Sequence, residues 1–553
     1  MSHTSQVEIE RKYDVGDEAL DPTFTAVEGI EGVVVDEAVK LEAVYYDTEG
    51  LDLLRRRIIV RRREGGGDEG WHIKRPAREG RTELHWPLET ASDVSTGAGS
   101  GQASGLVSPV PDAVLEPVRV VVRDRPLTPL ARISTTRRAT HLLNVRGQAV
   151  AEFADDSVTA SDVRGGVVRA WREWEVELLA GAPDTEEERT ALLDAIEVAV
   201  LAEDARVSAS PAKIARALGV ESVEGMLRAG KAASTGSPKK TSSSSEQPLT
   251  SKSSAADVIV QVLRGYIAEL ERLDPLARAD EPDAVHRMRA AARRIRSVLS
   301  AYGCLFTEQP AGQLRQQLRE LGGVLGVARD AEVRAQRADD ELDELGHRAD
   351  DAARRRLVEG SLEQYRQAHA AALRLLSSAT YYRLFDALDA FVADPPLSEA
   401  GKKGKPIKAV ASAVIAAELK RLRQRAGAAA FAVASGASSV EAPREDKLHE
   451  TRKAARRLRF AAEAVSAGET AVLGKKYRHI AEGAERVQDA LGDHHDSVLF
   501  VEHLLRTSHE AHAAGENTFV YGALSARAEH RGAAALDSSP KALKRLDKRA
   551  ESL

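Results

Sequence analysis

Two acids and a base stand at every second position near the start of the chain. In the segment VEIERKY, residues 7–13, these are Glu8, Glu10 and Lys12. Successive side chains of a β-strand point to opposite faces, so the three share one face. Carboxylate oxygens suit Mg²⁺ or Mn²⁺, and a lysine beside them can bond a phosphate oxygen. Taken alone, the row is more typical of the solvated face of an antiparallel sheet.

More charged rows occur in the first 180 residues. They are Arg61 and Arg63 in RRRIIVRRR, His72 and Lys74 in GWHIK, Arg137 in STTRRAT, Glu152 and Asp156 in VAEFADD, and Glu173, Glu175 and Glu177 in REWEVEL. If these faces point inwards, the sheet must close around a polar interior. Basic rows would then bind phosphates, and acidic rows would hold a divalent cation. The dense arginines leave the register open, so that Arg62 could replace Arg61 or Arg63 as an inward residue.

The second half of the chain repeats a row of basic side chains. The first copy is His286, Arg289, Arg293 and Arg296, and 163 residues later the second is His449, Arg452, Arg456 and Arg459. On an α-helix each set forms one stripe. Each copy is followed by a related segment, LGVARDAEV with Asp330 or LGDHHDSVL with Asp496. A solvated face of good helix formers is the alternative, but arginines one turn apart repel each other and no acid is interleaved, so we expect a polyanion to bind.

Inorganic polyphosphate suits such stripes better than nucleic acid. Two facing helices form a narrow basic groove in which arginine can grip a flexible phosphate chain with paired donors. Duplex nucleic acid usually requires a broader basic surface, and single strands commonly stack on aromatic side chains. Aromatic residues are only 4% of this chain, which makes nucleic acid an unlikely partner.

The composition is that of a soluble globular protein of two or three domains. The 553 residues are 43% hydrophobic and 30% charged, and the net charge of −6 is close to balance. There is no run of 18 apolar residues and no signal-like start, so we expect a cytoplasmic protein without a membrane partner. The single cysteine, Cys304, cannot form an internal disulfide and is expected to be buried. Nothing in the sequence indicates an oligomeric state.

The order of patterns predicts an α+β protein. Short β-like runs reach to about Leu179, with a glycine-rich hairpin at residues 65–67 and a Gly/Ser-rich insertion at 91–105. The acidic stretch DTEEERTALLDAIEVAVLA and the segment SPAKIARAL predict helices. We expect a first domain at 1–225, a Ser/Lys-rich linker at 226–254, and a helical domain at 255–553 with halves of about 255–395 and 405–553.

The N-terminal motifs together resemble the CYTH domain, the family of triphosphate tunnel metalloenzymes. The resemblance rests on the E-x-E-x-K row, YYDTEGLDLLRRRIIVRRRE, GWHIK, TRR, AEFADD and REWEVEL, in that order. It implies an eight-stranded antiparallel β tunnel with flanking helices that uses Mg²⁺ or Mn²⁺. By position, Glu8 and Glu10 would hold metal, with Glu152, Asp156, Glu173, Glu175 and Glu177 as further candidates. Lys12, Arg61, Arg63, Lys74 and Arg137 would bind phosphates; Lys213 matches less closely, because Ala212 replaces the usual serine before it.

The C-terminal motifs resemble the CHAD domain, the conserved histidine α-helical domain. HRMRAAARRIR, HETRKAARRLRFAAE and the two aspartate segments carry this resemblance. It implies two pseudo-symmetric helical bundles and polyphosphate ligands that include both stripes and Lys453. Arg287, Arg294 and Arg457 lie off the stripes.

Together the two resemblances imply a metal-dependent phosphohydrolase. Its substrate would be inorganic triphosphate or polyphosphate, and Glu8, Glu10 and Lys12 would be its catalytic residues. Polyphosphate granules are then a candidate location within the cytoplasm. A non-catalytic polyphosphate-binding or granule-targeting protein is the first alternative, and adenylyl cyclase activity on ATP is the second.

Overall fold

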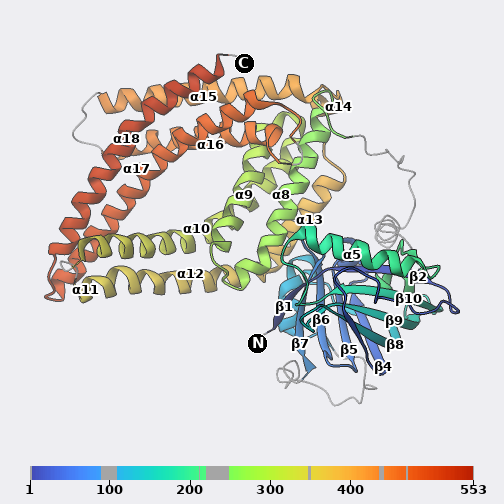
Figure 1. Ribbon diagram of the computed structural model, residues 1–553. Coiled ribbons are helices and arrows are strands. Elements are labelled where there is room, and N and C mark those ends of the chain that lie inside the picture. Colours follow the sequence, from blue (N-terminus) through green and yellow to red (C-terminus); the bar gives the residue numbers. More distant parts are fainter. Residues whose placement is uncertain are drawn as a thin grey trace. The chain divides into compact units, whose positions relative to one another are not determined.

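The chain folds into two compact units, residues 1–242 and 243–553 (Figure 1). The computed structural model describes residues 3–88, 109–210, 212–219, 248–346, 350–434, 441–468 and 471–551. The expected insertion at 91–105 lies outside the described residues, as does all of the expected linker except 248–254.

One curled antiparallel sheet organises the first unit, with eleven strands among the described residues. They are β1 (Thr4–Glu8), β2 (Glu10–Val15), β3 (Gly32–Val35), β4 (Val39–Asp47), β5 (Ile59–Glu64), β6 (Gly70–Pro76), β7 (Arg81–Pro87), β8 (Thr128–Leu143), β9 (Ala149–Asp162), β10 (Val168–Leu178) and β11 (Arg206–Val207). Their order is β1-β7-β6-β5-β4-β8-β9-β10-β2-β11, and β3 pairs with β8.

The two ends of this path meet in one segment of chain. Strand β1 pairs with β7, whereas β2 pairs with β10, and only Ile9 separates β1 from β2. The expected count of eight strands is wrong. One of the three extra strands arises because the expected first strand divides at Ile9 into β1 and β2, which pair with different neighbours. The other two are β3 and β11, whose four and two residues are too short to show an alternating sequence pattern.

Alternation along the strands separates a charged inner face from an apolar outer one. On β10, Trp174 and Val176 join a buried cluster with residues of the helix α5 (Glu186–Leu201), such as Ile196, while Glu175 and Glu177 line a cavity on the other face. Thr185 caps α5, because its hydroxyl oxygen accepts from the Glu188 amide at 3.3 Å.

A short helix closes a second apolar cluster. In α6 (Lys213–Ala217), Ile214 and Ala215 pack with Leu130 and Val158 of the sheet. This packing fixes Lys213, the first residue of the helix, at the inner face. The remaining short helices of this unit are α1 (Asp52–Arg55), α3 (Asp112–Leu115), η2 (Glu116–Val118) and α4 (Arg119–Val122).

The described residues of the second unit contain helices but no strand. These are α8 (Ala255–Arg278), α9 (Ala284–Ala301), η3 (Gly303–Leu305), α10 (Glu308–Leu345), α11 (Asp351–Arg354), η5 (Arg355–Glu359), α12 (Gly360–Leu376), α13 (Ala379–Ala393), α14 (Glu399–Lys402), α15 (Ile407–Ala434), α16 (Glu441–Ser466), α17 (Lys475–Ala513) and α18 (Phe519–Ala550). Helices α8, α9 and α10 pack in succession, as α15, α16 and α17 do, and α9 also packs on α16. The motif-bearing helices of the two repeats are therefore neighbours.

Two expectations outside the charged rows have different outcomes. Cys304 was expected to be buried, but it is exposed, because it falls in the short η3 after α9 rather than on a packed helix face. In the part of the chain that the structure describes, every helix is too short or too polar to cross a membrane.

Gly80 provides a test of how the first strand is held. Its φ is +66°, and an added Cβ would lie 1.9 Å from the carbonyl oxygen of Glu8. We expect Gly80→Ala to lower the free energy of unfolding of this unit by about 2 kcal/mol or more. All four tryptophans lie in the first unit, at positions 71, 86, 171 and 174, so tryptophan fluorescence during thermal unfolding reports on it alone. Gly16→Ala is the matched control, because nothing lies within 4 Å of its added Cβ. Equal melting temperatures for the two variants would contradict the close approach of Gly80 to the Glu8 carbonyl oxygen.

Candidate functional site: an enclosed cavity with charged walls

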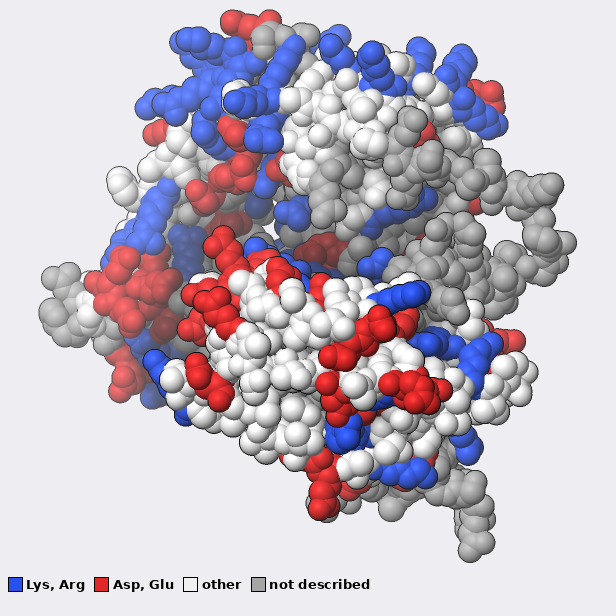
Figure 2. All heavy atoms as spheres, turned by 45° about the vertical axis from the view of Figure 1, so that its right-hand side comes forward, with Lys and Arg blue, Asp and Glu red and all other residues white. Residues whose placement is uncertain are grey.

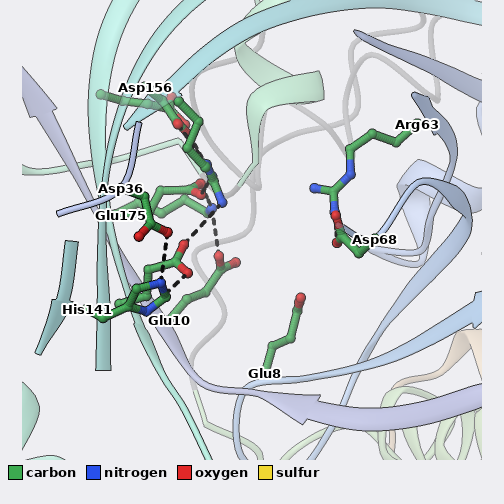
Figure 3. A network of polar contacts seen from close by, with 12 residues as sticks. Glu8, Glu10, Asp36, Arg63, Asp68, His141, Asp156 and Glu175 are labelled. Atoms are coloured by element: carbon green, nitrogen blue, oxygen red, sulfur yellow. Dashed lines mark hydrogen bonds and ion pairs between the residues drawn. The ribbon is translucent and has the colours of Figure 1, made fainter. Parts of the chain in front are cut away.

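The inner face of the sheet surrounds a cavity of about 340 Å³. Charged side chains from β1, β2, β5, β6, β7, β8, β9, β10 and α6 reach it. Among the predicted site residues, those that line it are Glu8, Glu10, Lys12, Arg61, Arg63, Lys74, Arg137, Glu152, Glu175, Glu177 and Lys213. Figure 3 shows Glu8 and Glu10 pointing into the same space, with Arg63 on its far side.

Lys213 lies at the centre of three buried carboxylates. Its Nζ is 2.9 Å from Asp156, 2.7 Å from Glu173 and 2.7 Å from Glu175. Within the described ranges, these acids form the one group of three whose ligand atoms all lie within 4.8 Å of one another, close enough to hold one metal ion without movement of the chain. Asp156 and Glu173 are not among the residues that line the cavity, so they support Lys213 from behind.

Arg137 and Lys12 extend this network. Arg137 donates to both oxygens of Asp156, at 2.8 and 2.7 Å, and to Glu175 at 2.6 Å. Lys12 donates to Glu10 at 2.8 Å and also to Glu175. Burial alone would raise the pKa of Glu175, yet Lys12, Lys213 and Arg137 together hold this pKa well below its usual range. Glu175 therefore remains ionised and holds three cations in place.

A row of acids runs across three neighbouring strands. Glu177 on β10 stands directly opposite Glu10 on β2 and opposite Glu152 on β9. Side chains so paired lie about 5 Å apart at Cβ, and like charges there repel. Burial raises the pKa of Glu177, and Glu10, Glu175 and Glu152 raise it further against the opposing charge of Lys74. The negative charge of this acid row exceeds the positive charge of its neighbouring cations. A bound divalent cation would reduce the repulsion between these carboxylates.

A second acidic pair lies at β1 and β7. Burial raises the pKa of Glu8 to about 7 and outweighs the charge of Lys74, whose Nζ lies 2.7 Å away, while hydrogen bonding with Glu83 raises it further. Burial would raise the pKa of Glu83, but His72 Nδ1 at 2.9 Å and the charges of Lys74 and Arg61 at 3.7 and 3.5 Å hold this pKa below its usual range. The two carboxyl groups thus share one proton, which resides on Glu8.

The structure resolves the arginine register on β5. Arg61 and Arg63 line the cavity, whereas Arg62 bonds Glu64. Burial and the neighbouring Arg61 and Arg137 lower the pKa of Arg63 to about 9. An ion pair joins Arg63 to Asp68 on the glycine-rich hairpin.

Sequence reasoning missed four acids of the cavity wall, Asp36, Glu37, Asp68 and Glu83. Glu83 lies in RTELHW, within the β-like runs before Leu179, and its two-residue alternation with Arg81 was an available signal. Its register opposite Lys74 could not be known before the strands were paired. Asp68 follows three glycines in a turn, where an acid is common for local reasons and no pattern indicates a site.

In the helical unit, the two predicted basic rows come together. Burial lowers the pKa of Arg456 to about 9, with Arg293 and Arg452 acting in the same direction. The pKa of Arg293 falls to about 10 for the same reasons, with Arg289 and Arg452 among its neighbours. Each copy of the repeat thus acts on the other, because α9 packs on α16. On the face that Figure 2 shows, Lys and Arg side chains gather at the top of the view, and Asp and Glu side chains gather at its left.

The repeats place their arginines in the same way. An added Cβ at Gly326 would lie 3.2 Å from Arg289, and one at Gly492 would lie 3.4 Å from Arg452. Arg289 also lies 3.3 Å from Asp330, and Arg452 lies 3.9 Å from Asp496. Both motif glycines therefore leave room for a guanidinium beside the following helix.

The two histidines begin these rows, and the remaining members differ in their partners. Burial lowers the pKa of both His286 and His449, so these rings are neutral at pH 7. Burial and Arg319 lower the pKa of Arg296, whereas Arg459 bonds Glu463 at 2.7 Å.

Residues beside the rows are engaged elsewhere. Arg457 bonds Glu418 at 2.8 Å and the Ser300 carbonyl at 2.8 Å. Arg287 is exposed, and Lys453 is an exposed residue that pairs with Glu450.

The fold and the two charged regions define an α+β protein in which a curled sheet with a charged interior precedes an all-helical unit with converging basic rows. The CYTH domain model matches residues 6–204, and the CHAD domain model matches residues 261–505. The chain belongs to the family in which a CYTH domain is followed by a CHAD domain.

Two relatives match this chain along nearly its whole length. The uncharacterized proteins Rv2226 and MT2285, from two strains of Mycobacterium tuberculosis, are 35% identical over 556 residues, which cover 98% of this chain and 96% of theirs. Two solved structures resemble part of the chain. PptA from Streptomyces chartreusis has 21% identity and a TM-score of 0.42, covering 53% of this chain and all of its own. The CHAD domain from the plant Ricinus communis has 22% identity and a TM-score of 0.41, covering 56% and 97%.

The shared proton predicts a pH-dependent stability. The pKa of Glu8 is about 7 in the folded chain, against a usual value of 4.5. Between pH 4.5 and 7 the folded chain keeps a proton on Glu8 that the unfolded chain loses. The stabilisation that this proton gives therefore falls as pH rises and is absent above pH 7. Glu8→Gln mimics the protonated form. At pH 8 we expect this variant to be more stable than wild type by about 2 kcal/mol and therefore to unfold at a higher temperature. Near pH 4.5 we expect the two proteins to unfold at the same temperature.

Tryptophan fluorescence with EDTA present measures this difference. Exposed Glu18 supplies the control, Glu18→Gln. A difference between Glu8→Gln and wild type that does not change with pH would refute the shared proton.

Proposed function

We propose that this protein is a metal-dependent phosphohydrolase that acts on inorganic triphosphate or polyphosphate, with a helical unit that binds polyphosphate. One observation carries the proposal. Lysines, arginines and carboxylates line a single cavity on the inner face of the sheet, so an anionic substrate and a cation can both be bound inside it. The sheet would act as the tunnel that the family resemblance implies.

The basic wall suits a chain of phosphates. Arg61 and Arg63 lie on β5 and Lys74 on the adjacent β6, while Lys12 and Arg137 approach from β2 and β8. Phosphate oxygens can replace the carboxylates that these cations now bond. The low pKa of Arg63 supports this role, because burial and the neighbouring Arg61 and Arg137 disfavour its charge despite the ion pair with Asp68, and an incoming anion would favour that charge.

The acid row fits a hard divalent cation. Glu10, Glu152 and Glu177 offer oxygen ligands in register, and Glu8 lies at the start of the same segment. The trio of Asp156, Glu173 and Glu175 is a second possibility only if Lys213 moves, because its ammonium bonds all three. We therefore assign Mg²⁺ or Mn²⁺ to Glu8, Glu10 and Glu177, with Glu152 beside them. When bound there, the cation would supply Lewis-acid chemistry, stabilising negative charge on the substrate and lowering the pKa of an attacking water.

The side chains themselves perform the remaining tasks. Lys12, Arg61 and Lys74 would neutralise the charge on the transferred phosphoryl group and hold the substrate in line. Glu175 would keep Lys12 oriented, since it bonds that ammonium and two further cations. The walls would exclude bulk water.

The helical unit supports the second part of the proposal. Burial and the neighbouring arginines of α9 and α16 lower the pKa of Arg456 and Arg293. The like charges in these rows therefore repel each other, and a bound anion would offset that repulsion. A flexible polyphosphate would relieve this repulsion along its length. Binding there would raise the concentration of chain ends available to the cavity, which is consistent with a cytoplasmic protein at polyphosphate granules.

Release of orthophosphate tests the activity. We expect the full chain to release it from tripolyphosphate with Mg²⁺ or Mn²⁺, and we expect Glu10→Gln to lower kcat by about a hundredfold or more, because it removes a ligand of the cation. Glu18→Gln is the control. If wild type and Glu10→Gln release phosphate equally fast, the assignment of the metal site fails. If wild type shows no turnover with either metal but still binds tripolyphosphate, the non-catalytic binding protein is favoured.

Substitution of two adjacent arginines on α16 tests polyphosphate binding and stability separately. Arg456→Gln removes a repelled, buried charge, so we expect a higher melting temperature and weaker binding of polyphosphate, by about tenfold. Arg457→Gln instead leaves the buried Glu418 without its closest partner, so we expect a lower melting temperature and unchanged affinity. Circular dichroism and equilibrium dialysis measure the two quantities. Equal effects of the two variants on both quantities would count against the binding stripe.

A further inference from the structure

The sheet cavity of the first unit has two different ends. Strand β6, which contributes Lys74 to the wall, runs from Gly70 to Pro76. At one end of β6 is the turn to β7, where Gly80 approaches the carbonyl oxygen of Glu8. At the other end is the hairpin that joins β5 to β6 and contains Asp68. Glu8, one of the acids assigned to the cation, and Asp68 therefore lie towards opposite ends of this strand.

Cations occupy successive levels between these two ends. The strand register pairs Arg61 with position 72 of β6 and Arg63 with position 70, two and four residues from Lys74. Along an antiparallel strand, two residues span about 7 Å. Lys74 and Arg61 share one partner, Glu83, at 3.7 and 3.5 Å. A phosphate chain that starts beside Lys74 would thus meet Arg61 next and Arg63 last.

The last cation of this series is already paired with an acid of the hairpin. The Asp68 carboxylate forms an ion pair with the Arg63 guanidinium, and both residues line the cavity. Figure 3 shows these two side chains end to end, across the cavity from Glu10. The Arg63 side chain is 9% exposed and that of Asp68 is 54% exposed. An acid that faces solvent therefore covers a buried base.

The hairpin backbone holds Asp68 in this place. His72 Nε2 lies 2.9 Å from the Asp68 carbonyl oxygen, which can only accept, so the ring donates. Gly65 and Gly66 have φ values of +84° and +83°, and an added Cβ at Gly65 would lie 2.4 Å from the Lys40 carbonyl oxygen of β4. Because the backbone is held by these contacts, the carboxylate of Asp68 is the part of the hairpin that an incoming anion can displace.

We propose that Asp68 is a specificity-determining residue, an internal competitor that a phosphate ligand displaces only when it is long enough to reach Arg63. This role rests on the proposed function, because the cation at Glu8 and its neighbours fixes one end of the ligand. A single phosphoryl group held there lies beside Lys74 and leaves Asp68 in place. A triphosphate extends to the Arg63 guanidinium, whose paired donors serve phosphate oxygens as well as a carboxylate.

Binding of a triphosphate analogue that cannot be hydrolysed tests this role. Carbon replaces its bridging oxygens, so Mg²⁺ can be present without turnover, and orthophosphate is the short probe. The melting temperature of the first unit, followed by tryptophan fluorescence at increasing ligand concentration, gives the affinity of that unit alone. We expect Asp68→Asn to bind the analogue about fivefold more tightly than wild type and orthophosphate as wild type does.

Two further variants isolate the contact. Glu69→Gln removes the same charge from the same hairpin, but Glu69 is not among the described residues that line the cavity. Its carboxylate accepts from the Gly65 amide at 3.2 Å, and the glutamine oxygen can still accept there, so this variant should bind as wild type does. In an Arg63→Gln background, Asp68→Asn should leave the affinity unchanged, because the competing pair is already absent.

Three results would overturn the role of Asp68. They are equal affinities of wild type and Asp68→Asn for the analogue, an equal gain in affinity for orthophosphate, and the same gain in Glu69→Gln. None of them bears on hydrolysis. Conversely, a lack of phosphate release from tripolyphosphate would contradict the proposed activity and leave this role standing, because binding of the analogue involves no turnover.

Discussion

Compensation of buried charge is the constraint on which this structure depends. A charged group taken out of water destabilises the fold unless an opposite charge or a hydrogen bond offsets the loss of hydration. The curled sheet meets this requirement inside its cavity. Lys213, Lys12 and Arg137 converge on Glu175, and Trp174 and Val176, which alternate with Glu175 on β10, pack with α5 on the outer face.

The compensation is uneven, and the uneven places are where ligands are expected. Around Glu175 the charges balance, and its pKa is strongly lowered. Around Glu8 and Glu177 burial and neighbouring acids outweigh the charge of Lys74, and both pKa values are raised. Arg63 shows the opposite imbalance on the facing wall. A cation and a phosphate chain that bind together would correct both, which explains why one cavity contains rows of both signs.

The helical unit departs further from balance. Arg293 and Arg456 are buried beside like charges from both repeats, which is an unfavourable arrangement for a structural element alone. Neighbouring Arg457 shows the ordinary solution, because it is paired with buried Glu418. Of these two adjacent residues, Arg456 has the charge expected to serve a ligand, whereas Arg457 has the charge expected to serve stability.

The sequence alone determined what local periodicity can encode. Spacing of two placed Glu8, Glu10 and Lys12 on one face, and offsets of three and four placed Arg289, Arg293 and Arg296 on one stripe, because these periods follow from backbone geometry. Pairing over long separations was decided only in the folded chain. The opposition of Glu10 and Glu177, the approach of Glu83 to Lys74, and the meeting of Arg293 with Arg456 all depend on strand register and helix packing between residues far apart in sequence. The exposed Cys304 belongs to the same class, because burial is a property of the whole packed unit rather than of a residue type.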